Sequence, residues 1–206
     1  MRAPLKGSLV GAVVLGCTVV TATAAAQNFT PYLGVGFGAT VPTGDFHADA
    51  NGDGYNAGWH GLALVGFNLP KLPVGIRVEG AYNQNGANDR LKAAISALTG
   101  APADSKTELL GGNVDLTYQF GISSPAKAYV LGGVGVENVR VSVTSGGVTK
   151  DTRETRFAWN AGAGLTYGLG VAALFLEARS FRVAEASSGM KIAFFPITAG
   201  IRFGGK

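Results

Sequence analysis

The chain has 206 residues, a formal net charge of +4 and only 15% charged residues. A positive charge this small and this evenly spread excludes the strongly basic surface that nucleic-acid binding needs, so we expect no nucleic-acid partner. Cys17 is the only cysteine, which excludes disulfides within the chain and cysteine-rich metal sites. The 32 glycines follow no collagen-like period.

The N-terminal residues 1–26 have the three parts of a secretory signal peptide. Arg2 and Lys6 give a positive start, Ser8–Val20 is an uncharged and mostly apolar run, and small residues end at Ala26. We therefore predict signal-peptide cleavage near Ala26.

Two alternatives stay open for this segment. A membrane-spanning helix would need roughly 20 predominantly apolar residues, and lipoprotein processing would act at Cys17 within VLGC. With cleavage near Ala26, the mature chain 27–206 has the length of one domain and no cysteine.

Period-2 alternation of apolar with polar or small residues recurs through the mature chain and predicts β-strands. In the first such segment, Leu33, Val35 and Phe37 share one face, while glycines occupy the other. The eight predicted strands are 31–41, 59–69, 74–82, 109–120, 128–137, 156–168, 173–181 and 194–203.

The connections between these strands alternate between long and short. Long loops are predicted at 42–58, 84–107 and 143–155, with tight turns around Pro70–Pro73 and at 121–126. An even number of strands with this alternation is typical of a barrel that crosses the outer membrane. We predict an all-β fold, an eight-stranded antiparallel up-and-down transmembrane β-barrel, with its apolar face toward lipid.

Aromatic residues gather near the strand ends, as expected where amphipathic rings meet the two membrane interfaces. The predicted belts contain Trp59, Tyr82 and Trp159 at the ends facing the long loops, and Tyr118, Phe120 and Tyr167 at the ends facing the short turns. An aromatic core inside a soluble protein is the alternative. A soluble carrier similar to a lipocalin is a further alternative. In such a carrier the apolar faces would line the interior of the barrel and the charged residues would lie outside.

Seven charged residues fall on the face opposite the apolar one. They are Arg77, Glu79, Asp115, Glu137, Glu177, Arg179 and Arg202. An eight-stranded barrel has an interior just wide enough for side chains to fill, and charges there need partners because unpaired buried charges are costly. We predict a polar network that fills the lumen. A network that exchanges partners and admits water or ions is the alternative.

Two segments of the long loops contain local motifs. Asp49, Asn51 and Asp53 stand at alternate positions, as the ligands of a calcium-binding loop do. An EF-hand loop needs an acidic residue at its twelfth position, where this chain has His60. We therefore favour a surface loop over a weak calcium site. Residues 88–100 predict a short helix that Asn88 or Asp89 caps and Gly100 ends.

Four stretches support a resemblance to a known family. They are Tyr32–Val41, PTGDF at 42–46, LFLEARSF at 174–181 and ITAGIRF at 197–203. The mature chain resembles the outer-membrane-protein β-barrel family of Gram-negative bacteria, and its plan is similar to the eight-stranded transmembrane domain of outer membrane protein A. The resemblance implies that the barrel-assembly machinery recognises the last strand through Gly200, Ile201 and Phe203, although this chain continues with Gly204–Lys206.

The expected role is non-enzymatic, structural or in surface interaction, without cofactors. Outer-membrane lipids, lipopolysaccharide and an extracellular partner at the long loops are the expected partners. A narrow porin-like channel for water or small ions is the main alternative. A lipid-modifying enzyme is a further one, but neither His47 nor His60 has a serine nucleophile in its segment.

Overall fold

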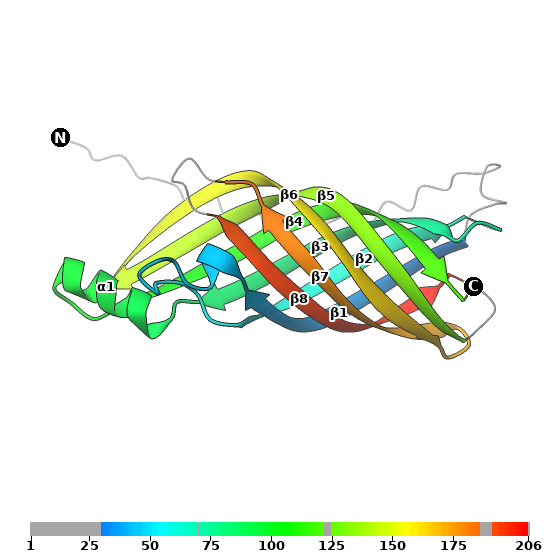
Figure 1. Cartoon of the computed structure of the whole chain (residues 1–206), viewed down its shortest axis with the longest axis horizontal. Helices are drawn as coiled ribbons and strands as arrows, with labels where there is room; N and C mark the ends of the chain where they lie inside the picture. Colours follow the sequence, from blue (N-terminus) through cyan, green and yellow to red (C-terminus); the bar gives the residue numbers. More distant parts are fainter. Residues whose placement is uncertain (1–29, 70, 122–124, 186–190, 206) are drawn as a thin grey trace, which may run out of the picture.

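The computed structural model describes residues 30–69, 71–121, 125–185 and 191–205. Each strand pairs antiparallel with its neighbours in sequence, and β1 also pairs with β8, which closes the barrel (Figure 1). The strands are β1 (Thr30–Pro42), β2 (Gly58–Asn68), β3 (Val74–Gly86), β4 (Ala103–Phe120), β5 (Ala126–Ser145), β6 (Val148–Gly168), β7 (Ala172–Val183) and β8 (Ile192–Gly204). The predicted fold class is confirmed. The predicted signal peptide, 1–26, lies outside the described residues.

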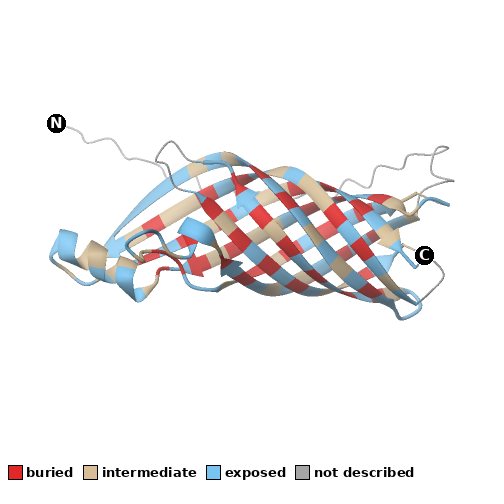
Figure 2. Cartoon of the chain, viewed as in Figure 1, coloured by how far each residue is buried: buried red, intermediate tan, exposed pale blue. Residues whose placement is uncertain are grey.

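Side chains alternate between the lumen and the outer surface along every strand, which gives the chequered burial in Figure 2. On β1, Leu33, Val35 and Phe37 are each more than half exposed, whereas Tyr32 and Thr40 are buried. All seven predicted lumen charges are buried. A lipocalin-like carrier would need the reverse arrangement, so that alternative is wrong.

The two ends of the barrel differ in their connections. We call the loop end the one that carries the connections β1–β2, β3–β4, β5–β6 and β7–β8, and the turn end the opposite one. The loop end holds the short helix η2 (Gly44–Phe46) and the helix α1 (Asp89–Thr99), which projects beyond the strands (Figure 1). Both predicted long loops that contain these helices are present, although β3 and β4 extend into the second of them.

The predicted loop at 143–155 is wrong, because strand pairing continues through it. β5 and β6 pair from Ala126↔Tyr167 out to Ser145↔Val148, and a two-residue turn of Gly146 and Gly147 joins them. Both glycines have positive φ, +55° and +80°, as the turn that matches the twist of a hairpin requires. β4, β5 and β6 therefore rise beyond the other strands at the loop end.

Helix α1 begins and ends as the sequence predicts. The side chain of Asn88 accepts a hydrogen bond from the Leu91 backbone N–H, and Gly100 ends the helix in the left-handed conformation with φ +71°. The Nδ2 atom of Asn88 also donates to the Gly52 carbonyl, which ties the helix to the first loop. In the part of the chain that the structure describes, no helix has the length and apolar character to cross a membrane.

Glycine allows large rings to lie close against the inner wall. A Cβ atom at Gly66 would overlap the Tyr32 ring, and one at Gly200 would overlap the Phe175 ring. At these two positions glycine relieves crowding inside the narrow barrel.

Candidate functional site

An ionic network joins opposite walls of the lumen. We define the ionic network as Arg77 and Glu79 of β3, Asp115 of β4, and Glu177 and Arg179 of β7. The alternation of a strand turns residues two apart to the same face, so RVE on β3 and EAR on β7 both point inward. Each member is at most 4% exposed. Two arginines against three carboxylates leave one net negative charge.

Each arginine contacts the same three carboxylates. Arg77 lies 2.8 Å from Glu177, 3.3 Å from Glu79 and 3.3 Å from Asp115, measured between nitrogen and oxygen atoms. Arg179 binds Glu79 through two parallel bonds of 2.5 and 2.7 Å, contacts Glu177 and lies 3.6 Å from Asp115. Bidentate bonds of this kind are the strongest between charged side chains.

Neutral groups complete the network. The hydroxyl of Tyr129 donates to Glu177 at 2.7 Å, and the side-chain amide of Asn160 donates to Asp115 at 2.8 Å. The carboxylates thus receive bonds from four strands, β3, β5, β6 and β7, and these bonds couple the walls of the barrel.

The two remaining predicted lumen charges lie apart from the network. Glu137 on β5 accepts one long bond of 3.4 Å from Asn113, and its Oε2 atom has no partner among the described residues. Arg202 on β8 packs over the Tyr32 ring, with its guanidinium carbon 5.1 Å from the ring centre. The sequence therefore placed all seven charges inside the barrel but could not predict that only five of them meet.

Replacing Glu137 by glutamine is expected to raise the free energy of unfolding by about 1–2 kcal/mol. The amide removes a buried charge that no described cation contacts and supplies a donor for the Oδ1 atom of Asn113, which also has no partner among the described residues. Urea titration, followed by the difference in gel mobility between folded and unfolded barrel, measures the change. Glu79→Gln is the matched control and should destabilise, because it weakens the paired bonds to Arg179. Equal effects of both substitutions would contradict this account.

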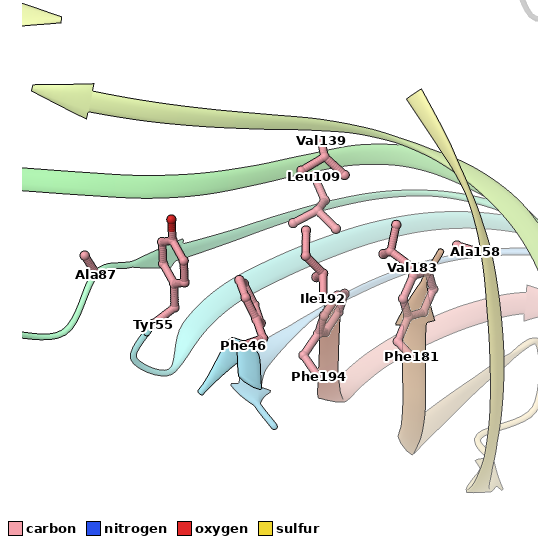
Figure 3. Close-up of a cluster of buried hydrophobic side chains, with 10 residues drawn as sticks. All are labelled: Phe46, Tyr55, Ala87, Leu109, Val139, Ala158, Phe181, Val183, Ile192 and Phe194. Carbon is pink, nitrogen blue, oxygen red and sulfur yellow. The ribbon is translucent and has the colours of Figure 1, made fainter. Parts of the chain in front are cut away.

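An apolar cluster closes the loop end of the lumen (Figure 3). We define the loop-end cluster as Phe46, Tyr55, Ala87, Leu109, Val139, Ala158, Phe181, Val183, Ile192 and Phe194. The Phe194 ring stacks on Phe181 at 5.0 Å between centroids and meets Phe46 at 6.5 Å. Sequence reasoning missed this cluster, yet Phe181 and Val183 share the inward parity of Glu177 and Arg179.

The two histidines lie in different environments. His47 is exposed in the first loop, whereas His60 is 2% exposed inside the lumen, where its Nε2 atom lies 3.0 Å from the Thr198 hydroxyl oxygen. The lipid-modifying enzyme needs a histidine beside a nucleophile at the outer leaflet. His60 is enclosed by the barrel wall instead.

The Asp49–Asp53 motif forms a local turn. Asp49 Oδ1 accepts backbone bonds from Asn51 at 2.7 Å and from Asp53 at 3.0 Å, and Arg90 of α1 donates to the Asn51 carbonyl at 2.9 Å. Among the described residues, no three His, Cys, Asp or Glu side chains gather as a metal site. Weak calcium binding here stays a prediction.

The upper parts of β4, β5 and β6 carry charged outward side chains in place of apolar ones. Arg140 joins Glu108 at 3.2 Å and Asp151 at 2.6 Å across these strands. This lies beyond the outward apolar residues, of which Leu110 is the last on β4. The bond from Arg140 holds the pKa of the Asp151 carboxyl below its ordinary value. The three strands thus present a charged surface beyond the apolar outer wall.

Comparison with protein families gives the decisive match. Residues 11–203 match the model of the outer membrane protein beta-barrel domain. The chain belongs to this family. The protein is an outer membrane β-barrel of Gram-negative type, as the resemblance predicted. No curated protein sequence matched the chain.

Three solved structures illustrate the shared fold. Neisserial surface protein A is 17% identical, with 85% of this chain and 96% of that chain covered and a TM-score of 0.53. Ail of Yersinia pestis, in complex with the heparin analogue sucrose octasulfate, is 14% identical, with coverage of 86% and 100% and a TM-score of 0.51. A major outer membrane protein from Thermus thermophilus is 12% identical, with coverage of 86% and 99% and a TM-score of 0.60. At such identities, the likeness concerns the fold alone.

In this family setting, the aromatic side chains remain the expected membrane belts. Trp59 and Trp159 are each 43% exposed and lie in strand parts near the loop end. The ring centroids of Tyr82 and Trp59 are 5.1 Å apart. Tyr118 and Phe120 face outward near the turn end, with ring centroids 4.9 Å apart, and Tyr167 is also exposed there. Their contact with the lipid interface is a proposal that these positions support.

The residues of the expected assembly signal lie on β8. Phe203 faces outward and pairs with Leu33 of β1 and Ala172 of β7, while Gly200 faces the lumen. Ile201 has the same outward parity as Phe203. Recognition of these residues by the barrel-assembly machinery is likewise a proposal.

Proposed function

We propose that this barrel has a non-enzymatic role as a structural or surface-interaction protein of the outer membrane, after removal of its signal peptide near Ala26. The observation that carries the proposal is the filling of the lumen by the ionic network and the loop-end cluster. The charged members are at most 4% exposed, and Leu109, Ile192 and Phe194 at most 1%, so solvent barely reaches them. Such packing supports a closed barrel.

The loop end supplies the contact surface in this proposal. Helix α1 and the upper parts of β4, β5 and β6 project beyond the other strands (Figure 1). Lipopolysaccharide would surround the base of this projection, and an extracellular partner would meet its tip. The Ail structure contains the heparin analogue sucrose octasulfate, and a sulfated glycan is the first partner class to test here. On this chain it would have to compete with the carboxylates of Glu108 and Asp151, which pair with Lys106 and Arg140.

The wild-type chain is expected to give no conductance steps in planar lipid bilayers, because two packed layers block the lumen. The measurement is the ionic current across bilayers containing protein whose folding is verified by its heat-dependent gel mobility. An empty bilayer and a porin of known conductance are the controls. Regular steps in wild type would overturn the closed-barrel proposal.

The runner-up function is a narrow channel, and one observation favours it. Arg77 and Arg179 reach the same three carboxylates, so the network can exchange partners without moving its backbone. In a channel, current would appear in wild type and would change with Glu177→Gln. A closed barrel predicts silence for wild type whatever the salt concentration.

A further inference from the structure

We propose that the upper part of β6 binds an extended acidic peptide segment of another protein, which adds to the sheet of the barrel as a further strand. The inference rests on the surface-interaction role proposed above and names the kind of partner. β5 pairs with one side of β6 from Val148 to Tyr167, whereas β7 pairs with the other side only as far as Ala158. We call residues 149–155 of β6 the open edge, because no strand among the described residues pairs with their second side.

The register identifies the backbone groups that face this second side. In an antiparallel pair, the N–H and C=O of one residue bond to the same neighbouring strand, and those of the next residue point the opposite way. The Phe157 carbonyl accepts a bond of 2.8 Å from the Ala184 N–H, on the β7 side. The pairing with β5 continues without a bulge up to the turn at Gly146 and Gly147, so alternate residues keep this direction.

Four residues of the open edge therefore point their backbone N–H and C=O groups away from β5. They are Thr149, Asp151, Arg153 and Thr155. None of these groups has a hydrogen-bond partner among the described residues. A row of unpaired backbone donors and acceptors is a template for another strand, and peptides that bind in this way take their affinity from main-chain hydrogen bonds.

The opposite edge of the same projection is covered. β4 forms that edge, and helix α1 packs against its upper part. The Ser96 hydroxyl of α1 accepts a bond of 2.9 Å from the Ala103 N–H, and the Ser105 carbonyl accepts one of 2.8 Å from the Ala87 N–H. The open edge of β6 has no such cover in the described part of the chain, and all of its residues except Glu154 are exposed. Only one edge of the projection is thus available to a partner.

The charges of the open edge favour an acidic partner. Its two acids, Asp151 and Glu154, already bind Arg140 at 2.6 Å and Arg156 at 2.5 Å. Its two bases, Lys150 and Arg153, form no salt bridge with the described residues. Opposite charges across a strand pair stabilise it and like charges destabilise it. An acidic strand therefore fits the edge, whereas a second copy of this chain would bring the same two unpaired bases to the contact.

A synthetic peptide tests this inference. The probe is a fluorescent heptapeptide of threonine with glutamate at its third and sixth positions, which antiparallel pairing along the open edge places opposite Arg153 and Lys150. Fluorescence anisotropy measures its binding to the full barrel in phosphatidylcholine nanodiscs. The same peptide with lysine in place of glutamate is the control and should bind about tenfold more weakly.

Amide exchange, followed by NMR, distinguishes strand addition from attraction between charges. At a peptide concentration of ten times Kd, exchange should slow about tenfold at the N–H groups of Asp151, Arg153 and Thr155. The N–H groups of Thr152 and Glu154 point toward β5 and should change little. Sucrose octasulfate, an anion without a peptide backbone, should leave all of these amides unchanged.

Two substitutions at one position isolate the backbone donor. Thr155→Pro removes an N–H that faces the partner and has no bond within the described barrel, so the edge strand should tolerate it. Thr155→Val keeps the N–H, and both variants lose the bond that Asn138 donates to the Thr155 hydroxyl. Proline should weaken binding of the glutamate peptide about tenfold, and valine by less than about twofold.

Several results would overturn the proposal. They are absence of glutamate-peptide binding, binding that leaves the three amides unprotected, equal binding of the lysine peptide, and equal effects of proline and valine. Self-association of wild type that Thr155→Pro abolishes would identify a second copy as the occupant instead. Amide exchange in wild type decides the matter if Thr155→Pro does not fold. Silent bilayers without peptide binding would remove this inference alone and leave the closed barrel in place.

Discussion

Replacing Arg179 by methionine is expected to lower the free energy of unfolding by about 3–5 kcal/mol. Arg179 forms the paired bonds to Glu79 and contacts Glu177 and Asp115. Without it, three buried carboxylates share Arg77 alone, and the net charge of the network falls from −1 to −2. Uncompensated buried charge is what makes breaking such a pair more damaging than replacing the whole pair.

Urea titration of the folded barrel in detergent or lipid measures this loss. Arg153→Met is the matched control: Arg153 is an exposed arginine on the upper part of β6, and its replacement should change stability by less than about 0.5 kcal/mol. The double variant Arg179→Met with Glu79→Gln should recover part of the loss, because it restores the net charge. A single variant as stable as wild type would show that the network contributes nothing to folding.

Alternation predicted the barrel because lipid and lumen impose opposite chemistry on successive residues. On β7, Leu174 and Leu176 face outward while Glu177 and Arg179 face inward, and the sequence placed all four correctly. The residues of a single strand are enough to show which of its two faces is apolar. The identity of the outward and inward faces thus needs no knowledge of distant segments.

Pairing across the lumen could not be predicted in the same way. Arg77 and Glu177 are separated by 100 residues and lie on β3 and β7, which share no strand pairing. Their contact depends on the tilt and stagger with which the sheet closes, and closure is a property of all eight strands. Hence the sequence predicts that Glu137 and Arg202 face the lumen, as it does for the five residues of the ionic network. It does not show that these two residues lie apart from that network.

The two missed features share one cause. The outer part of the β5–β6 hairpin, 143–155, is predicted as a loop because residues 150–155 are all charged or hydroxyl residues, without an apolar face. The part of a strand that extends beyond the membrane is surrounded by water, so it does not need an apolar outer face. The loop-end cluster was missed because inward positions are expected to be polar, yet above the ionic network several of them are apolar. Both errors follow from applying one pattern to strands that pass through more than one environment.

Replacing Phe194 by alanine is expected to lower the free energy of unfolding by about 3–5 kcal/mol. Phe194 is 1% exposed, stacks on Phe181 and contacts Phe46, so removing its ring leaves a cavity that the rigid barrel wall cannot collapse to fill. The neighbouring Phe195 provides a matched control because it faces outward and is 44% exposed. Phe195→Ala should cost roughly 1–2 kcal/mol, the transfer contribution of the ring without the cavity.

The same substitution separates the two layers that close the lumen. Phe194→Ala opens the loop-end cluster but leaves the ionic network in place, so bilayers containing it should stay silent. Adding Glu177→Gln loosens the network by weakening its contacts with Arg77 and Arg179, and the double variant should pass current. Current through Phe194→Ala alone would show that the apolar cluster is the real barrier and that the network, despite its burial, already conducts. Silence of a folded double variant would place the barrier elsewhere in the lumen.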